Sequence, residues 1–346
     1  MRLPTHPDGK VNFDLSTPLL RYAIENGINF FDSHHFYHQG QSEEAIGRAI
    51  KGIPREKLIL QTKIGMYNNY KEKDCRRLLE EALKKLNTDY IDFYFTHSLN
   101  LKDYREYNKL FLKFTGKALK QGLIRHRGFS VHDRPENIRE FILSEEYSAM
   151  LIQYNLIDRT NEELLHLAHE KGLGVEVMGP VAGGLLAMPN ENIFRNSPVK
   201  VKTSAELALK FVLANPDIDV AVSGMSTLRQ VQENVSTASA PDRLSRQDAK
   251  KLAGTFEERK KLLELYCTGC QYCMPCPNKV AIPAIFRFYN LAKVYGFVDR
   301  ARKGYAGLKP EEKASACTEC GACEPKCPQK ISIRKKLKEA KSYFES

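Results

Sequence analysis

The stretch GINFFDSHHFYHQGQSEEAIGRAI, residues 27–50, decides the fold. Its apolar run at 28–31 has the length of a buried strand and ends at Asp32, and after a polar loop a helical segment opens at Ser42. The same alternation of a short apolar run and an amphipathic helical stretch recurs along the chain. The further apolar runs lie at 58–62, 91–96, 123–130, 150–155, 174–179 and 219–224. Strictly alternating strands and helices predict a parallel sheet.

A parallel sheet of this length is either doubly wound or closed into a barrel, and the polar residues distinguish the two. No GxGxxG motif follows the first strand. Instead, Asp32, Lys63 and His97 each follow a different predicted strand. Because a (β/α)₈ barrel assembles its active site at the carboxyl ends of its strands, the sequence predicts an α/β protein with a TIM-type (β/α)₈ barrel.

Four separated motifs carry a resemblance to a known family. The opening stretch resembles the signature of the aldo/keto reductase family, in which a strand ends in Asp, a Tyr follows five residues later, and a Ser-Glu pair (here Ser42 and Glu43) opens the next helix. The segments LQTKIG and YFTHSL are similar to the family's lysine and histidine blocks, and later blocks follow in order over roughly residues 15–238. The resemblance implies an NAD(P)-dependent oxidoreductase that reduces an aldehyde or ketone, with a catalytic tetrad of Asp32, Tyr37, Lys63 and His97.

The chemistry of carbonyl reduction accounts for these four residue types. The carbonyl carbon takes a hydride and the oxygen takes a proton, and a tyrosine with its usual pKa near 10 is too weak an acid to supply that proton alone. A lysine ammonium beside the phenol lowers its pKa, and an aspartate holds the ammonium in place. A histidine orients the substrate oxygen. Each residue taken singly has a structural alternative, such as a helix cap or a solvated side chain, and the joint pattern favours catalysis.

The resemblance also implies a nicotinamide site. Ser130 and Gln153 match family positions for the nicotinamide, although His132 stands where the family's asparagine is expected. A helix that starts near Ser226 would present N–H groups to a phosphate. Arg229 could pair with a 2′-phosphate, so we favour NADP over NAD. The residues that match the block around the adenine end of the cofactor are Gly224, Ser226, Arg229, Gln230, Glu233 and Asn234.

Three histidines, His34, His35 and His38, lie close together after the first predicted strand. We interpret them as residues that line the substrate pocket, because no acidic or thiolate ligand joins them in register to bind a metal. The family's barrel begins with a strand that ends in a Gly-rich turn, whereas seven strands are predicted here and the first strand is missing. We therefore expect that Met1 is internal to a longer reading frame, and that the upstream sequence encodes an apolar strand ending in Gly.

Eight of the nine cysteines lie in two tight runs, CTGCQYCMPCP and CTECGACEPKCP. In a reducing compartment such runs favour metal ligation over disulfides. The second run is the CxxCxxCxxxCP pattern of bacterial ferredoxins and the first is a near copy, which predicts two 4Fe-4S clusters and leaves a zinc site as the alternative. By analogy with two-cluster ferredoxins, one cluster takes Cys267, Cys270, Cys273 and Cys327, and the other takes Cys317, Cys320, Cys323 and Cys276.

The balance of charged residues changes near the position where the cysteine-rich part of the chain begins. Residues 241–346 contain 22 Lys and Arg against 12 Asp and Glu, whereas residues 1–240 contain 31 against 30. We predict a barrel over 1–240 and a small ferredoxin-like iron–sulfur domain over 241–346. The basic surplus suits an acidic electron carrier such as a ferredoxin or flavodoxin, and no nucleic-acid-binding motif accompanies it.

The chain has no apolar run of the length of about 18 residues that a membrane span needs, and no signal peptide is recognisable, so we predict a cytoplasmic protein without membrane partners. Three hypotheses for the clusters stay open. They exchange electrons with a carrier while the barrel reduces a small carbonyl compound, they are structural, or the whole chain is a nicotinamide-binding redox sensor. An activated tyrosine argues against the sensor.

Overall fold

The chain folds into two compact units. The structure is a computed structural model of the chain that describes residues 2–66, 70–187, 197–262, 265, 267, 273–327 and 330–346. The first unit comprises Met1–Ala187 and Ala205–Ser245, and the second comprises Met188–Ser204 and Arg246–Ser346. The division into a barrel over 1–240 and an iron–sulfur domain over 241–346 stays a prediction.

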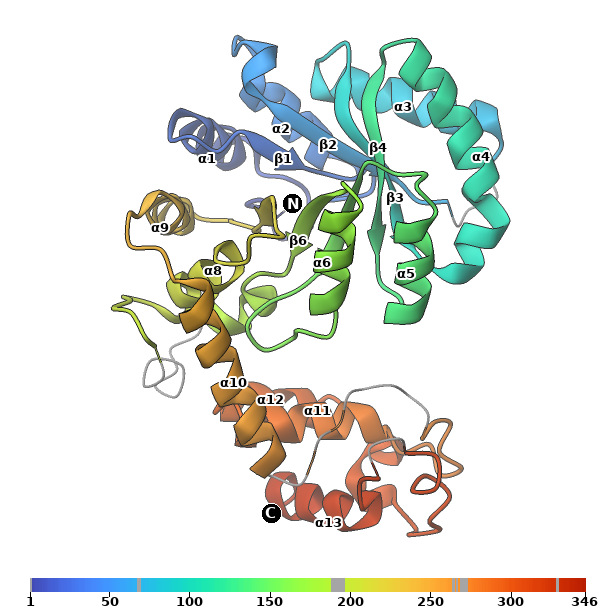
Figure 1. Cartoon of the computed structure of the whole chain (residues 1–346), viewed down its shortest axis with the longest axis vertical. Coiled ribbons are helices and arrows are strands. Elements are labelled where there is room, and N and C mark those ends of the chain that lie inside the picture. The colour runs from blue at the N-terminus through green and yellow to red at the C-terminus, as the bar shows by residue number, and fades with distance from the viewer. Residues whose placement is uncertain are drawn as a thin grey trace. The chain divides into compact units, whose positions relative to one another are not determined.

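The first unit is built on one parallel sheet of seven strands that pair in chain order, as predicted (Figure 1). Within the described residues β1 and β7 do not pair with each other, so they form the two edges of a nearly closed barrel of the (β/α)₈ type. The strands are β1 (Phe30–Asp32), β2 (Ile59–Ile64), β3 (Ile91–Leu99), β4 (Ile124–Val131), β5 (Ala149–Gln153), β6 (Gly174–Met178) and β7 (Val220–Val222).

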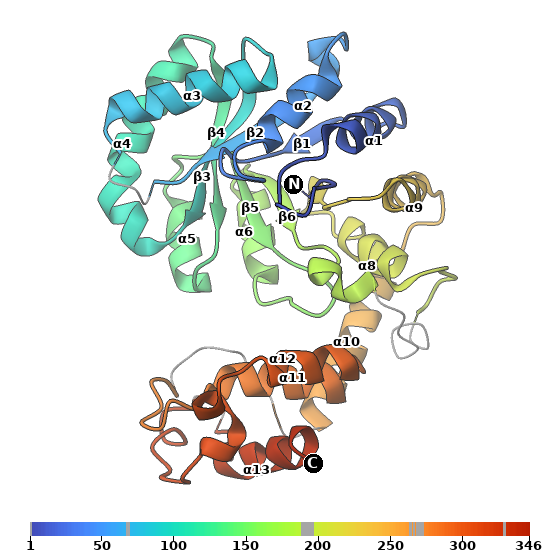
Figure 2. The same cartoon turned by 180° about the vertical axis from the view of Figure 1, so that it is seen from behind.

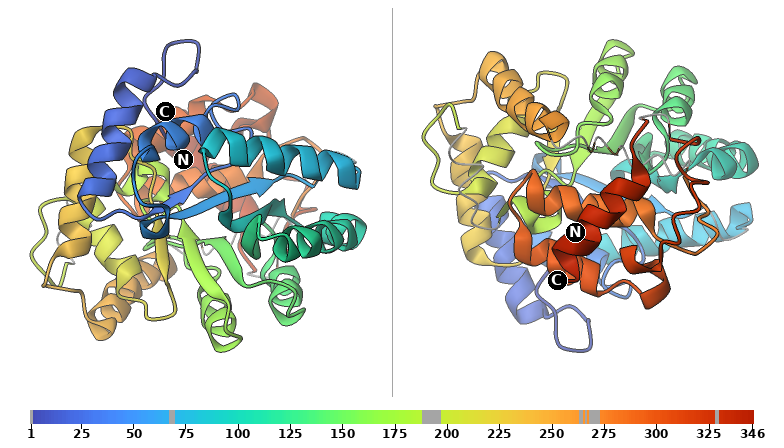
Figure 3. Two further views of the ribbon diagram at one scale, coloured as in Figure 1. Left: turned by 90° about the horizontal axis from the view of Figure 1, so that it is seen from above. Right: turned by 90° about the horizontal axis from the view of Figure 1, so that it is seen from below.

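Helices cover the outside of this sheet, as Figure 2 and the left panel of Figure 3 show. Each is amphipathic; α3, for example, buries Leu78, Leu79, Ala82 and Leu86 and exposes its charged residues. The helical elements of the first unit are α1 (Phe13–Glu25), α2 (Ser42–Ile50), η1 (Arg55–Lys57), α3 (Glu72–Leu86), α4 (Leu101–Lys120), α5 (Pro135–Leu143), α6 (Glu162–Glu170), η2 (Ala182–Ala187), α8 (Ser204–Leu213) and α9 (Leu228–Ser239).

Side chains of β3, β5, β6 and β7 form a cluster between the strands. Phe95, Ala149 and Leu151 are buried there, and Phe93, Met178 and Val222 pack against them. The filling depends on Gly128 of β4, because a Cβ atom there would lie 2.2 Å from the Phe95 ring and 2.5 Å from the Ala149 carbonyl oxygen. The barrel is therefore a packed core and not a pore.

The second unit is helical around a small apolar core (Figure 3, right panel). Phe286, Tyr289 and Leu337 are among the residues of that core, and six cysteines pack against it. Its helical elements are α10 (Arg246–Leu262), α11 (Ile282–Lys293), α12 (Val298–Ala306), η3 (Pro310–Glu312), η4 (Ala314–Ala316) and α13 (Ile333–Phe344). Among the described residues of the whole chain, no helix combines the length and the apolar character that crossing a bilayer requires.

We predict that Gly128→Ala destabilises the first unit by about 1–3 kcal/mol, because the added methyl group overlaps the Phe95 ring and the Ala149 carbonyl. Chemical denaturation followed by circular dichroism measures the change. Gly116→Ala in α4 is the matched control, since a Cβ atom there meets nothing within 4 Å and alanine favours the helix. Equal stability of the two variants would contradict the close packing at Gly128.

Candidate active site

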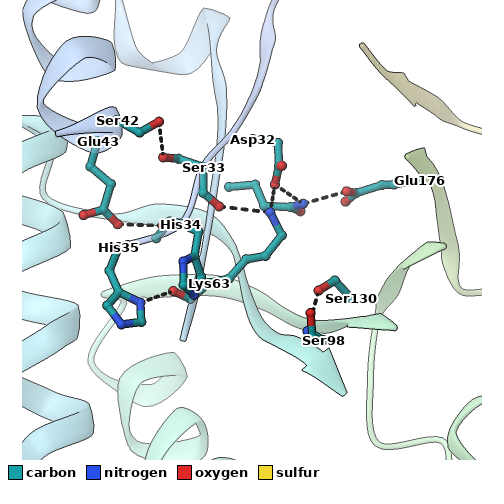
Figure 4. Close-up of polar contacts among 12 residues, drawn as sticks. Asp32, Ser33, His34, His35, Ser42, Glu43, Lys63, Ser98, Ser130 and Glu176 are labelled. Carbon is teal, nitrogen blue, oxygen red and sulfur yellow. Dashed lines mark hydrogen bonds and ion pairs between the residues drawn. The ribbon is translucent and has the colours of Figure 1, made fainter. Parts of the chain in front are cut away.

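A buried ion pair lies at the centre of the first unit, and Figure 4 shows its surroundings. Successive side chains of a strand point to opposite faces, so Gln61 and Lys63 of β2 share one face. On the other face, Thr62 donates a hydrogen bond to Glu43 of α2 over 2.6 Å. The Lys63 ammonium donates to the Asp32 carboxylate at the end of β1 and to the Ser33 carbonyl, the latter over 2.9 Å. Lys63 is 1% exposed and Asp32 is 6% exposed, so both charges are withdrawn from water.

Tyr37 and His97 complete the predicted tetrad beside this pair. The Lys63 Nζ atom lies 5.6 Å from the centre of the Tyr37 ring. The rings of Tyr37 and His97 meet edge to face, with their centres 6.0 Å apart. Three strand ends and one loop thus bring together the four residues predicted from three separate motifs.

Neutral imidazoles surround the tyrosine. Burial lowers the pKa of His97 to about 4, and the Lys63 charge adds to the effect. Burial lowers the pKa of His34 to about 2, and its ring lies 4.0 Å from the His97 ring and 5.2 Å from the Tyr37 ring, centre to centre. At neutral pH His97 can therefore donate a hydrogen bond to a substrate oxygen but does not carry a charge.

The Ser-Glu pair of the signature has a structural role. The Ser33 hydroxyl donates to the Ser42 hydroxyl over 2.9 Å, which fixes the loop after β1 to the start of α2. Glu43 is buried and accepts the Thr62 hydrogen bond, which fixes α2 to β2. Together these bonds hold the loop that carries Tyr37.

The predicted nicotinamide residues lie at the ends of two adjacent strands. The Ser130 hydroxyl at the end of β4 accepts the Ser98 N–H over 2.9 Å. Gln153 ends β5, and its side chain lies against Gly179, where a Cβ atom would be 2.6 Å from the Gln153 Oε1 atom. Gly179 also has a φ of 67°, so glycine is favoured there on both grounds.

The block predicted for the adenine end of the cofactor surrounds the start of α9. The helix begins at Leu228, and the Gln230 side chain accepts the N–H groups of Ser226 and Thr227 over 2.8 and 3.2 Å. These two N–H groups are therefore not free, and a phosphate would displace Gln230 or bind to later donors of the turn. Arg229, 84% exposed, pairs with Glu233 over 3.5 Å.

Two more residues of that block lie beside α9. Asn234 donates to the Ser223 hydroxyl over 3.2 Å, which links α9 to the end of β7. Gly224 follows in the chain and lies directly against Arg2, since a Cβ atom on it would be 2.8 Å from the Arg2 Cγ atom.

The histidines after β1 do not form a metal site in the described part of the chain, where no three His, Cys, Asp or Glu side chains are placed to hold one ion. The His38 Nε2 atom accepts the Leu3 N–H over 3.2 Å, and the His35 Nδ1 atom lies 3.1 Å from the Lys63 carbonyl oxygen. Their role as pocket lining stays a prediction.

Sequence reasoning missed three residues. Gln61 and Glu176 extend the polar contacts of Asp32 into the barrel, and the aliphatic part of the Arg2 side chain lies against Gly224. A glutamate inside an otherwise apolar strand run was a visible signal for Glu176. Gln61 carried the same kind of signal inside the apolar run at 58–62, and no comparable signal marked Arg2.

The predicted cluster ligands lie in the second unit, except that Cys270 falls outside the described residues. Cys267, Cys273, Cys276, Cys317, Cys323 and Cys327 are partly buried against the apolar core, and Cys320 is exposed. Four zinc-bound thiolates converge on one ion, whereas each thiolate of a 4Fe-4S cluster binds a separate iron. All-cysteine donor sets suit iron–sulfur clusters, and among the described residues no three His, Cys, Asp or Glu side chains are placed to hold a single ion.

Contacts between the two cysteine runs support the predicted exchange of the fourth ligand. Burial raises the pKa of the Cys323 thiol, and the nearby Glu324, Cys317 and Cys276 raise it further. Asn278 donates to the Thr318 hydroxyl over 2.7 Å, which joins the end of the first run to the start of the second. Cys276 is thus near enough to Cys323 to act on its pKa, and the exchange of the fourth ligand stays a prediction.

The pattern of the aldo/keto reductase family matches residues 1–255, most of the chain. The chain belongs to the aldo/keto reductase family. A 4Fe-4S dicluster domain matches residues 266–332. The protein is thus an oxidoreductase of this family with a C-terminal 4Fe-4S domain.

Curated relatives match the barrel part. The uncharacterized oxidoreductase YqkF of Bacillus subtilis is 29% identical over 266 residues, which cover 68% of this chain and 85% of the relative. The NADH-specific methylglyoxal reductase of Escherichia coli is 28% identical over 275 residues, which cover 66% of this chain and 84% of the relative.

Solved structures agree on the fold. The holo form of aldo-keto reductase AKR11C1 from Bacillus halodurans has a TM-score of 0.61 and 28% identity, with 69% of this chain and 86% of that chain covered. An aldo/keto reductase from Klebsiella pneumoniae, solved with NADP and acetate, has a TM-score of 0.60 and 24% identity over 72% of this chain and 89% of that chain. At that identity the second likeness shows the fold alone.

We predict that Cys276→Ser and Cys320→Ser each lower the bound iron by about half, because each removes a ligand of the same cluster. The double variant of Cys276→Ser and Cys320→Ser should lose no more iron than either single variant. The double variant of Cys276→Ser and Cys327→Ser should lose most of its iron, because it removes one ligand from each predicted cluster. Iron and acid-labile sulfide assays after anaerobic purification measure the content. Cys75→Ser, at a buried cysteine of α3, is the control. An additive loss in the first double variant would contradict the exchange.

Proposed function

We propose that the barrel reduces a small aldehyde or ketone with hydride from NAD(P)H, and that Tyr37 donates the proton. The observation that carries this proposal is the position of the buried Lys63 ammonium, 5.6 Å from the centre of the Tyr37 ring and held by Asp32. A sensor that only binds a nicotinamide needs no cation beside a tyrosine, so the assembled tetrad favours an enzyme over the sensing alternative.

Each residue of the tetrad has a separate step in the proposed reaction. A reduced nicotinamide, when bound, would supply the hydride that the carbonyl carbon takes. As negative charge develops on the carbonyl oxygen, the Tyr37 phenol transfers its proton to that oxygen. The Lys63 ammonium stabilises the phenolate that remains, and Asp32 keeps the ammonium in place. His97, neutral because burial lowers its pKa to about 4, donates a hydrogen bond to the same oxygen.

Of the residues in the block predicted for the adenine end of the cofactor, Arg229 is the one that favours NADPH over NADH. Its guanidinium is exposed and pairs with Glu233 over 3.5 Å, so a 2′-phosphate would compete with that carboxylate. Arg2, which lies against Gly224, would add a second cation near the phosphates. The Escherichia coli relative is named as specific for NADH and for methylglyoxal, so both nicotinamides and this ketoaldehyde belong in the first assays.

For the second unit we propose two 4Fe-4S clusters that exchange electrons with an acidic carrier protein. The exposure of Cys320 brings one predicted cluster to the surface, where an electron can pass to a partner. Exposed lysines flank Cys327, the last cysteine of the second run, with Lys326 directly before it and Lys330 three residues after it. The surplus of basic residues over 241–346 is the charge that an acidic carrier complements.

We predict that Tyr37→Phe lowers kcat for carbonyl reduction by about a hundredfold or more, because the proton donor is lost while the ring is retained. Steady-state oxidation of NADPH and NADH with a panel of small carbonyl compounds measures the rate, and circular dichroism checks the fold. Tyr90→Phe is the matched control, since that ring lies between Arg55 and Arg125, outside the tetrad. Turnover of Tyr37→Phe equal to that of the control would refute the role of Tyr37.

A further prediction concerns the carrier. Anaerobic stopped-flow mixing with a reduced acidic ferredoxin should bleach the cluster absorbance, with a second-order rate that falls as ionic strength rises. Lys326→Glu and Lys330→Glu should slow this transfer, while Lys120→Glu on α4 should not. An absence of electron transfer at every ionic strength, with carbonyl reduction intact, would leave the clusters with a structural role.

A further inference from the structure

Two polar residues adjoin the tetrad without belonging to it. They are Gln61, which carries an amide, and Glu176, which carries a carboxyl group. The Gln61 Nε2 atom donates to the Asp32 Oδ1 atom over 2.9 Å and to the Glu176 Oε2 atom over 2.6 Å (Figure 4). Glu176 lies on β6, in register with Leu151 of β5 and Val220 of β7. One amide thus connects a carboxyl group of β6 to the aspartate of the buried ion pair.

These contacts join one cation to two carboxyl groups inside the barrel. Lys63, Asp32 and Glu176 are 1%, 6% and 3% exposed, and Gln61 is fully buried. If both carboxyl groups were ionised, Lys63, Asp32 and Glu176 together would carry a net negative charge in an apolar interior. Such a buried charge is strongly unfavourable. One carboxyl group must therefore hold a proton.

The contacts indicate which of the two carboxyl groups holds the proton. Asp32 accepts from the Lys63 ammonium directly, whereas the one polar partner that the structure shows for Glu176 is the uncharged Gln61 amide. Burial raises the pKa of Glu176 well above its usual range, and the Asp32 charge raises it further. Gln61 and Lys63 act in the opposite direction, and Asp219, exposed at the start of β7, adds a smaller rise. Leu151 of β5 contributes no charge.

We propose that Glu176 is a positioning residue that is held as a neutral carboxylic acid. Its carbonyl oxygen accepts one Gln61 N–H, so the other N–H of the same amide is directed at Asp32 and helps to hold that carboxylate against Lys63. Its proton keeps the buried group free of a second negative charge. The Lys63 charge then remains available to stabilise a phenolate at Tyr37. The catalytic part of this proposal rests on the proposed function, whereas the protonation state of Glu176 does not.

The protonation state has a readout that needs no substrate. The H₂O-minus-D₂O infrared difference spectrum of the full chain at neutral pH should show a carboxylic acid C=O band that disappears in Glu176→Gln. Glu170→Gln, at an exposed residue of α6, is the control and should leave the band unchanged. Retention of every carboxylic acid band in Glu176→Gln would overturn the proposal.

Turnover tests the positioning role. Glu176→Gln keeps a neutral acceptor for Gln61, so kcat should stay within about twofold of wild type and the alkaline limb of its pH profile should not move. Glu176→Leu removes the acceptor, so kcat should fall by about tenfold and the alkaline limb should move to higher pH, since Asp32 and Lys63 are held less firmly. A denaturation curve checks that Glu176→Leu is folded.

Two kinetic results would overturn the positioning role. If Glu176 were ionised in the wild type, its replacement by neutral Gln would strengthen the field of Lys63 and move the alkaline limb to lower pH. Wild-type turnover by a folded Glu176→Leu would show that Gln61 needs no acceptor. If the wild type reduces no carbonyl compound, the proposed function fails, and the infrared comparison still decides the state of Glu176.

Discussion

The structure of the first unit depends on a buried ion pair between Lys63 and Asp32. Withdrawing two charges from water is costly, and the cost is recovered only when the partners are close and their remaining hydrogen-bonding capacity is satisfied. The register of β1 and β2 meets that condition, because Asp32 lies opposite Gln61 and Lys63 comes one pleat further along the same face. The Ser33 carbonyl and the Gln61 amide satisfy the remaining groups. A loss of either charge would leave the other buried without a partner of opposite charge.

The same pair explains the electrostatics around it. Because the Lys63 charge is not screened by water, it acts strongly on the neighbouring rings and helps to lower the pKa of His97 to about 4. Neutral histidines and a tyrosine beside a fixed cation form an environment that favours a phenolate and not an imidazolium. The parallel sheet makes this possible, because it brings the carboxyl ends of β1, β2 and β3 to one edge.

The second unit follows a different principle. Its apolar core is small, and six of the described cysteines pack directly against that core. The predicted ligands of the clusters therefore also contribute to the packing of the unit. The contact between Asn278 and Thr318 joins two cysteine runs that are far apart in the sequence. Iron–sulfur clusters carry one electron each, while a nicotinamide transfers two as hydride, so the two units supply different redox chemistry within one chain.

The sequence by itself determined the features that depend on local patterns. Apolar runs of strand length placed all seven strands within a few residues of their observed ends, and the motifs that resemble the aldo/keto reductase family implied the tetrad. The spacing of the cysteines predicted the iron–sulfur domain in the same way. Only the tertiary structure showed that Gln61 connects Asp32 to Glu176, a contact across 115 positions of the chain. Strand and helix periods follow from neighbouring residues, whereas contacts across a barrel depend on how the strands pair and which faces they share, and no local pattern encodes that.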